Sequence, residues 1–268
     1  MNLKTVASLI FLQVGLLVTS SFAQNATSDS IDAFLTKNMQ QRSIPALQIA
    51  VVRGGKIVKD TTFGVANLEY NIKAHKESLF NINSITKAFV GIAVMQLAEE
   101  GKLKITDPLS KHLDSLPDNW KDITLQQALA HTSGLPDILD EEEQVLGHGD
   151  EGEAMQKVKA LPIVFKTGEK VRNNQTGYVL VGQIITKLSG MHFTRFIEER
   201  QFKVAGMKST RFGDSFDVIP NYAGAYRITR QVGDRFERTA TPGVSYMQFP
   251  LFFRTAAGIL STATDMGN

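Results

Sequence analysis

The sequence has no cysteine among its 268 residues, and its 29 basic and 27 acidic side chains leave a net charge of only +2. Without cysteine there can be no disulfide, no thiolate zinc site and no cysteine nucleophile. Because the charges nearly balance, the chain has no excess of positive charge that would bind a polyphosphate, and we expect no nucleic-acid partner. The content of 43% hydrophobic and 21% charged residues excludes a disordered or collagen-like chain and is typical of a globular protein.

Metal and nucleotide sites also lack support in the sequence. The five histidines never fall at HxxxH or HExxH spacing, so we expect no metal site and no cofactor. Residues 147–152 spell GxGxxG, but no strand is expected before them, and the acidic residues around them would repel a pyrophosphate. We interpret this segment as a solvated acidic loop. No serine lies in GxSxG, which excludes the nucleophile elbow of the α/β-hydrolases.

The first 23 residues have the layout of a secretory signal peptide. Lys4 precedes an apolar stretch from Val6 to Val18, and Ser21-Phe22-Ala23 closes the segment. A membrane anchor is the alternative interpretation. The apolar run is shorter than the ~20 residues that a spanning helix needs, and no basic segment follows it. We therefore expect a mature chain of residues 24–268 that is exported and has no stable membrane anchor after cleavage.

Hydrophobic periodicity predicts a first helix, an early β-hairpin and then a helical block. Two β-rich runs at residues 46–52 and 57–63 flank Gly54-Gly55, a strong hairpin signal. From Gly213 onward we expect a loop-rich tail, because no further pair of strands is equally clear. Helical spacing predicts helices at residues 30–41, 86–100 (ending at Gly101), 125–129 (after Thr124), 179–188 (ending at Ser189-Gly190) and 193–199.

The chemistry that the sequence offers lies at the start of the helix predicted over residues 86–100. Ser84-Ile85-Thr86-Lys87 is the one SxxK in the chain. Residues three apart share a helix face, so the amine of Lys87 would come within reach of the Ser84 hydroxyl. Burial would make Lys87 a usable proton acceptor, and the helix N-terminus would stabilise an oxyanion. The alternative is that Ser84 only caps the helix and Lys87 extends to solvent, and spacing alone does not decide between the two.

Six segments in a fixed order, spread over residues 44–265, point to one known family. They are residues 80–87 (FNINSITK), 103–113 with Asp107-Pro108-Leu109, 129–136 (LAHTSGLP), 177–182 (GYVLVG), 206–210 (GMKST) and 257–262 (AGILST). In these segments the chain resembles the serine β-lactamases and penicillin-binding proteins. The resemblance is specifically to the class C-like branch, which contains β-lactamases, D-alanyl-D-alanine carboxypeptidases and esterases.

The resemblance implies an α+β, β-lactamase/transpeptidase-like fold, which is an antiparallel sheet flanked by helices with an inserted all-helical region. Residues 24–80 would begin the α/β part, and residues 84–212 would be mainly the helical part. Ser84 would be the nucleophile, acylated by an amide, ester or β-lactam, and Lys87 its proton partner. The substrate would be a small molecule or peptide, and the location the periplasm or exterior of a bacterium. We expect His131 to belong to a helix-ending turn and not to the site.

The sequence departs from the family pattern at its second motif, TyrxAsn, in which the phenol moves a proton and the amide orients the substrate. Alignment on Gly168 and Gly177-Tyr178 places Asn173 and Gln175 at these two positions, and we expect both to bind substrate. Gln175 keeps an amide. Asn173 does not titrate, and the loss of a general acid or base typically costs about 10² to 10⁴ in rate. A catalytically impaired relative that binds a peptidoglycan-like or β-lactam ligand is therefore the alternative function.

A second departure concerns the end of the sequence. Family members continue for on the order of a hundred residues beyond Ser261-Thr262. These residues include a strand with a Lys/His-Thr/Ser-Gly triad, which supplies a donor to the oxyanion hole. Loss of one such donor costs ~10² to 10³ in rate. By this comparison the C-terminal sheet strands are missing and the domain at residues 24–268 is incomplete. An incomplete gene product and a truncated, inactive protein remain alternative interpretations. The substrate and the oligomeric state cannot be deduced from the sequence.

Overall fold

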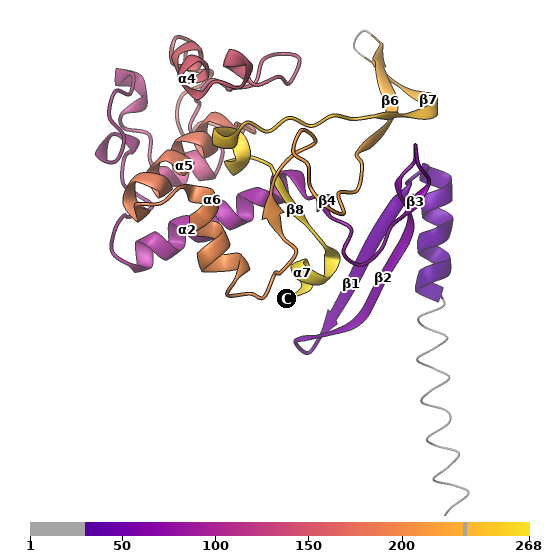
Figure 1. Ribbon diagram of the computed structural model, residues 1–268. Coiled ribbons are helices and arrows are strands. Elements are labelled where there is room, and N and C mark those ends of the chain that lie inside the picture. The colour runs from indigo at the N-terminus through magenta and orange to yellow at the C-terminus, as the bar shows by residue number, and fades with distance from the viewer. Residues whose placement is uncertain (1–29, 233–234) are drawn as a thin grey trace, which may run out of the picture. The chain divides into compact units, whose positions relative to one another are not determined.

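The computed structural model describes residues 30–232 and 235–268 and divides the chain into two compact units (Figure 1). The first unit ends at Lys76, and the second runs from Glu77 to Asn268. The expected signal peptide at residues 1–23 lies outside the described residues. In the described ranges, no helix combines the length and the apolar character that crossing a membrane requires.

The first unit contains a helix over residues 30–42 and a three-stranded antiparallel sheet in the order β1-β2-β3. Both the helix and the hairpin agree with the predictions. Gly54 and Gly55, at the turn, have φ values of +58° and +72°, a conformation that fits the twist of the flanking strands and costs glycine little. The strands are β1 (Ala46–Arg53), β2 (Lys56–Asn67) and β3 (Ile72–Lys73).

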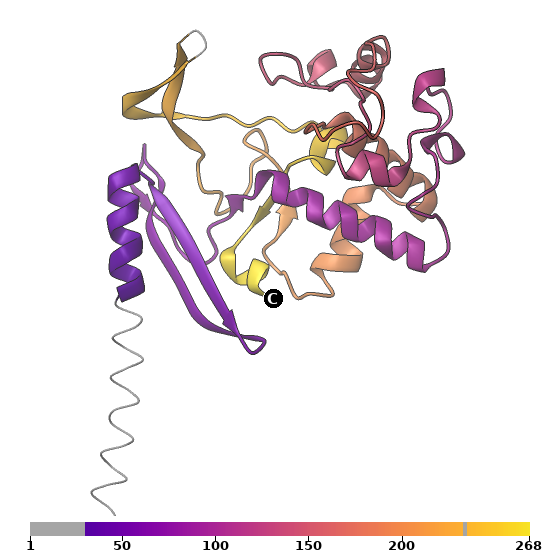
Figure 2. The same ribbon diagram turned by 180° about the vertical axis from the view of Figure 1, so that it is seen from behind.

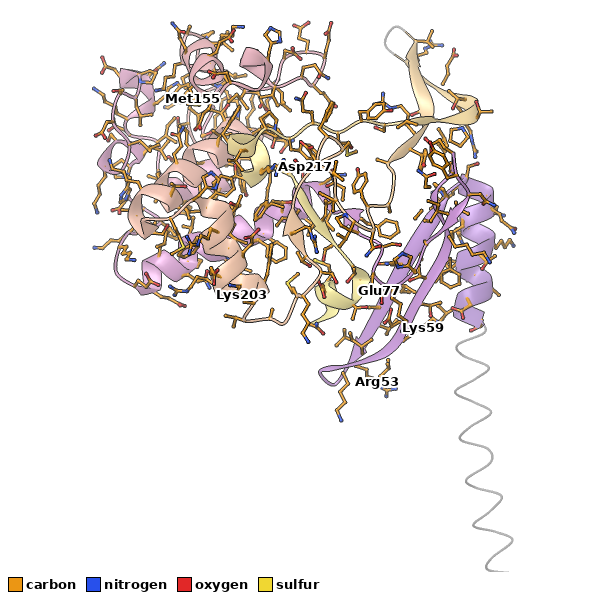
Figure 3. The ribbon with its side chains drawn as sticks, in the orientation of Figure 1. Arg53, Lys59, Glu77, Met155, Lys203 and Asp217 are labelled. Carbon is orange, nitrogen blue, oxygen red and sulfur yellow. The ribbon has the colours of Figure 1, made fainter. Side chains whose placement is uncertain are left out.

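An ion pair joins the helix to the sheet within the first unit. The ammonium of Lys59 on β2 lies 2.6 Å from the carboxylate of Asp32 on the helix. Figure 3 shows Lys59 on its strand and Arg53 at the end of β1, next to the hairpin turn.

Helices dominate the second unit. The predicted helices are present, and α4 and α7 are additional. Short 3₁₀ helices occupy Asn83–Ile85, Leu109–Lys111, Asp118–Trp120, Leu146–Gly149 and Leu251–Thr255, and a π-helical turn, Glu198–Phe202, follows α6. The α-helices are α2 (Thr86–Glu99), α3 (Leu125–Leu129), α4 (Glu151–Lys159), α5 (Thr176–Ser189), α6 (Phe193–Ile197) and α7 (Ala263–Gly267).

Local sequence signals set the helix ends. Thr124 caps α3 in a capping box, because its side chain accepts the backbone N–H of Gln127 while the Gln127 side chain accepts that of Thr124. The left-handed conformations of Gly101 (φ +69°) and Gly190 (φ +72°) mark the ends of α2 and α5, as predicted. The GxGxxG segment leads into α4, where Asp150 accepts the backbone N–H of Glu153 as an N-cap.

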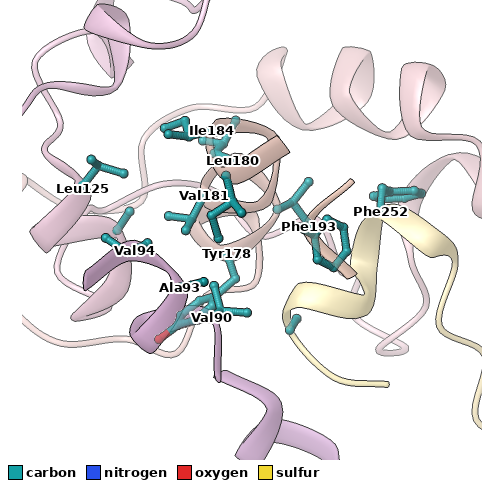
Figure 4. Close-up of a cluster of buried hydrophobic side chains, with 14 of the residues drawn as sticks. Val90, Ala93, Val94, Leu125, Tyr178, Leu180, Val181, Ile184, Phe193 and Phe252 are labelled. Atoms are coloured by element: carbon teal, nitrogen blue, oxygen red, sulfur yellow. The ribbon is translucent and has the colours of Figure 1, made fainter. Parts of the chain in front are cut away.

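The core of the second unit forms where α2 packs against α5, and Figures 1 and 2 show α2 beside α5 and α6. Burial of these aliphatic faces is the main stabilising contribution to the helical block, since each large buried side chain contributes about 1.5–3 kcal/mol. Figure 4 shows Val90, Ala93 and Val94 of α2 opposite Tyr178, Leu180, Val181 and Ile184 of α5, together with Phe193 of α6.

The expectation of a loop-rich tail from Gly213 is wrong in part. The tail contains β8 and a two-stranded hairpin, β6–β7. The sequence did not predict β8 because it is a short, fully buried run without alternation. Its partner β4 also lies at the other end of the second unit along the sequence. The strands are β4 (Phe80–Asn81), β8 (Ile259–Ser261) and β5 (Arg211–Phe212), antiparallel in the order β4-β8-β5, and β6 (Tyr226–Val232) with β7 (Arg235–Val244).

Candidate active site

The SxxK segment lies where β4 passes into α2. The side chain of Asn81 accepts the backbone N–H of Asn83 at 2.9 Å, and Asn83 has a φ of +46°, so the chain turns sharply before the serine. Ser84 follows in the 3₁₀ turn Asn83–Ile85 and is exposed. Lys87 is in the first turn of α2 and is half-buried.

The ammonium of Lys87 is held by three neighbours. Nζ lies 3.1 Å from Oγ of Ser84 and donates to the carbonyl of Ala256 at 2.8 Å. It also lies 5.2 Å from the centroid of the Tyr178 ring, over the ring face. The side chain is therefore directed at the serine and does not extend into solvent.

The segment that precedes β8 places the Ala256 carbonyl. Arg254 donates from Nε to the carbonyl of Phe249 at 2.9 Å, and its Nη2 lies 2.6 Å from a carboxylate oxygen of Asp217, which Figure 3 labels. On the other side, Thr86 at the start of α2 accepts the backbone N–H of Ile259 at 3.3 Å. The Arg254 contacts hold the residues just before Ala256, and the Thr86 bond fastens the first turn of α2 to Ile259, so Lys87 meets a preformed acceptor.

Burial lowers the pKa of Lys87 to about 8, because the ammonium loses hydration when it is removed from water. The negative charge of Asp137 acts in the opposite direction and raises it. A substantial fraction of Lys87 is therefore neutral slightly above neutral pH, and a neutral amine can accept a proton. The arrangement can activate the Ser84 hydroxyl as a nucleophile.

The structure places Asn173 and Gln175 just before α5. Asn173 is exposed and lines a small cavity, with a volume of about 30 Å³, together with Asp137 and Arg172. Gln175 is only 7% exposed, and its Oε1 has no hydrogen-bond partner among the described residues. Among the residues that the structure describes, no hydrogen bond or ion pair joins the side chain of Asn173 or Gln175 to Ser84 or Lys87.

Two residues that interact electrostatically with Lys87 were not identified as site residues from the sequence. His131 lies in the turn that ends α3, as expected, with a φ of +59°. Its Nδ1 accepts the backbone N–H of Asn174 at 3.1 Å, and its pKa is lowered by burial and by the charge of Lys87. Asp137 accepts the next backbone N–H, that of Gln175, at 3.2 Å. Only its place after the LAHTSGLP segment could have drawn attention to Asp137.

Tyr178 is the phenol nearest to Asn173 along the sequence, but its hydroxyl is engaged in a hydrogen bond to the backbone. It donates to the carbonyl of Leu129 at 3.1 Å, which ties α5 to the end of α3. Burial raises its pKa, so the phenol keeps its proton at neutral pH. The face of the Tyr178 ring lies against Lys87, and the ring is also part of the hydrophobic core (Figure 4).

Comparison with known proteins agrees with the resemblance found in the sequence. Protein flp of Staphylococcus aureus (strain MW2) is 27% identical over 247 residues, which are 90% of this chain and 48% of that protein. The octameric penicillin-binding protein homologue from Pyrococcus abyssi has a similar structure, with a TM-score of 0.74 and 25% identity over 90% of this chain and 55% of that one. The chain thus spans about half the length of the curated relatives it matches.

A class C β-lactamase solved in complex with cefoxitin shares the fold, with a TM-score of 0.74 and 22% identity over 91% of this chain and 64% of that one. The predicted α+β, β-lactamase/transpeptidase-like fold class is therefore confirmed. The family model described as Beta-lactamase matches residues 31–268, which include the turn with Ser84 and the whole helical block. The chain belongs to the beta-lactamase family.

Proposed function

We propose that the protein is an exported serine hydrolase that cleaves an amide, ester or β-lactam through an acyl-enzyme on Ser84. The observation that carries the proposal is the 3.1 Å contact between Nζ of Lys87 and Oγ of Ser84 at the start of α2. Support comes from the lowered pKa of Lys87, about 8, which provides a proton acceptor beside the hydroxyl. Membership of the beta-lactamase family supports the same reaction class.

The first half of the reaction forms the acyl-enzyme. Neutral Lys87 takes the Ser84 proton while Oγ forms a bond to the substrate carbonyl carbon. The negative charge then resides on the carbonyl oxygen, and the positive end of the α2 dipole favours it. When the bond to the leaving amine or alcohol breaks, Lys87 returns the proton to that group. Ser84 is left as an ester, and Lys87 is neutral again.

In the second half, water hydrolyses this ester. A base must take one proton from the water as its oxygen attacks, and Lys87 is the titratable group in contact with Ser84. The proton then passes to Oγ of Ser84 as the ester breaks, which regenerates the hydroxyl and releases a carboxylic acid. Asn173 and Gln175 would contact the substrate from the segment before α5, with carboxamides that orient it and exchange no proton.

The substrates that we propose are small molecules or peptides. The cefoxitin bound to a class C β-lactamase of the same fold makes β-lactams a natural first test. We also propose that the chain acts in the periplasm or outside a bacterial cell, on the basis of the sequence layout at residues 1–23.

A second candidate function rests on Asn173. A carboxamide stands at the sequence position where the family pattern has a phenol, so deacylation would lack a proton carrier. Such a protein would bind and hold an acyl group without turning it over. The lifetime of the acyl adduct separates the two functions. An adduct that decays with continuing product release supports a hydrolase, and one that persists after a single stoichiometric burst supports a binder.

The test is steady-state hydrolysis of a chromogenic ester and a chromogenic cephalosporin by the full chain. We expect Ser84→Ala to abolish product release, including the burst. The matched control is Ser110→Ala, an exposed serine in the 3₁₀ turn Leu109–Lys111, which should behave like the parent protein. Product release that survives Ser84→Ala would overturn the proposal.

A further inference from the structure

A cluster of charged side chains lies next to Ala256, whose carbonyl accepts a hydrogen bond from the ammonium of Lys87. Arg254, two residues before Ala256, is the cation of the cluster, and its side chain is only 16% exposed. Its Nη2 donates to Oδ2 of Asp217 at 2.6 Å. The same nitrogen lies 3.7 Å from Oδ2 of Asp214, which is buried. The proposed reaction does not yet give these charges a role.

Arg254 and Asp214 together hold the backbone of Phe249. The Nε of Arg254 donates to the carbonyl of Phe249 at 2.9 Å, and the N–H of Phe249 donates to Oδ2 of Asp214 at 2.7 Å. The N–H of Asp214 in turn donates to Oδ2 of Asp217 at 3.2 Å. The start of the 3₁₀ helix that contains Arg254 is therefore fastened to the loop that carries the two aspartates.

The same 3₁₀ helix ends at Ala256 and sets the direction of this residue. The N–H of Ala256 donates to the carbonyl of Phe253 at 2.9 Å. Beyond Ala256 the chain returns to the stem of Arg254, because a Cβ built on Gly258 would lie 2.9 Å from Cγ of Arg254. Gly258 has a φ of +113°, which suits a glycine in this close approach. Arg254 thus holds Ala256 from both sides along the chain.

The energetics of the cluster favour a geometric role. Removing Arg254 and Asp214 from water is costly, and an apolar replacement of similar volume is often equally stable or more stable. A guanidinium is planar and carries five donors, so it can bond a carbonyl and a carboxylate at the same time in one fixed geometry. What the cluster contributes is therefore the placement of the peptide that Lys87 contacts.

We propose that Arg254 is a positioning residue for Lys87 and acts through the carbonyl of Ala256. This carbonyl takes one hydrogen of Nζ at 2.8 Å, which leaves the lone pair of the neutral amine free for the Ser84 hydroxyl, 3.1 Å away. A displacement of about 1 Å would misalign the amine, and such errors can cost about 10² in rate. Arg254 exchanges no proton, so the proton balance is unchanged. The inference rests on the proposed roles of Ser84 and Lys87.

The test combines Arg254→Met with Lys87→Ala in the full chain and measures acylation of Ser84 by a fluorophosphonate at about pH 9. Methionine keeps an unbranched stem against Gly258 but has no donors. We expect Arg254→Met alone to lower the rate about 10- to 100-fold. In the Lys87→Ala background it should lower the rate less than about twofold, because the group through which Arg254 acts is absent. Equal losses in both backgrounds, or no loss in either, would overturn the inference.

The matched control is Arg200→Met. The Nη2 of Arg200 lies 2.6 Å from Oε1 of Glu100, just after the opposite end of α2, and this variant should be acylated at the parent rate. If Arg254→Met does not fold, Arg254→Lys replaces it in the same cycle. Lysine keeps a charge for the two aspartates but not the planar fork, so the rate should fall at least about threefold when Lys87 is present. A rate equal to that of Arg200→Met would contradict the inference.

A measurement without catalysis separates this inference from the proposed function. In protein labelled with ¹³C-lysine, the resonance lost in Lys87→Arg identifies Lys87. We expect its Cε resonance to shift in Arg254→Met and to keep the parent position in Arg200→Met, because only the first variant releases the carbonyl partner. If the parent forms no Ser84 adduct, the proposed function fails, and this comparison still decides whether Arg254 acts on Lys87. An unchanged resonance in Arg254→Met contradicts the inference.

Discussion

The ammonium of Lys87 donates a 2.8 Å hydrogen bond to the backbone carbonyl of Ala256, 169 residues further along the chain. In its neutral form Nζ keeps two hydrogens and gains a lone pair. One hydrogen can therefore stay on Ala256 while the lone pair accepts the hydroxyl of Ser84, 3.1 Å away. The carbonyl thus orients the amine for proton transfer and does not compete with it.

The pH dependence of acylation should follow the ionisation of Lys87. Its pKa of about 8 lies below the ordinary value, and only the neutral amine accepts the serine proton. The rate of fluorophosphonate adduct formation should therefore rise with pH, about tenfold per unit below pH 8, and level off above it. Rates measured from pH 6 to pH 10 by intact mass check this. Lys87→Arg, which stays charged, should be about 10² to 10⁴ slower, whereas exposed Lys170→Arg should match the parent.

Asn173→Tyr should accelerate turnover. Under the proposed function, a phenol at this position would carry a proton to and from Ser84, a gain of about 10² to 10⁴ in rate for a general acid or base. The measurement is steady-state hydrolysis of a chromogenic ester. Asn173→Phe has the same ring without the hydroxyl and should be no faster than the parent. Equal rates for the tyrosine and phenylalanine variants would show that the missing phenol is not what limits the protein.

Much of the fold could be predicted from local sequence because the relevant signals are local. Gly54 and Gly55 define the hairpin, Thr124 and Gln127 form the predicted cap, and α2 follows an apolar run that ends at Gly101. The pairing of β4 with β8 could not be predicted. Phe80 faces Ser261 across a strand pair of two residues, and such short segments have no periodicity to detect.

The same distinction between local sequence signals and long-range contacts applies to the candidate site. Helical spacing put the Lys87 amine within reach of the Ser84 hydroxyl, and the 3.1 Å contact between them is what the structure adds. The approach to Ala256 depends on how residues 254–259 pack on α2, which no local pattern encodes. Asp137 was not identified because its contact with the backbone of Gln175 arises only when the loop after α3 meets the segment before α5. Tertiary contacts supply this part of the site.

Asp265 should be important for stability. It is buried, and its Oδ2 accepts the backbone N–H groups of Ser209 and Thr210 and the hydroxyl of Thr210, each at 2.8 Å. Asp265→Ala leaves three donors without this partner and should cost about 2–4 kcal/mol of unfolding free energy. Urea unfolding of the full chain measures the loss. Asp265→Asn retains one acceptor oxygen and should lose clearly less, and an equal loss in both variants would contradict this explanation.

Gly134 should tolerate no side chain. Its φ is +74°, and a Cβ built on it would lie 2.1 Å from the carbonyl oxygen of Phe165, a backbone atom that cannot move away. Gly134→Ala should therefore destabilise the chain by at least about 3 kcal/mol. Gly190, with a φ of +72° and open space around it, is the matched control. Gly190→Ala should cost only the backbone strain of about 1–2 kcal/mol, so similar midpoints in thermal unfolding would refute the steric argument.

Acylation of Ser84 is the central claim, and intact mass spectrometry with peptide mapping tests it most directly. The full chain is incubated at pH 8–9 with a fluorophosphonate and, separately, with a penicillin. We predict a single adduct on the peptide that contains Ser84 and no adduct in Ser84→Ala. An adduct that maps to another residue and persists in Ser84→Ala, or the absence of any adduct on the parent protein with either reagent, would contradict the account.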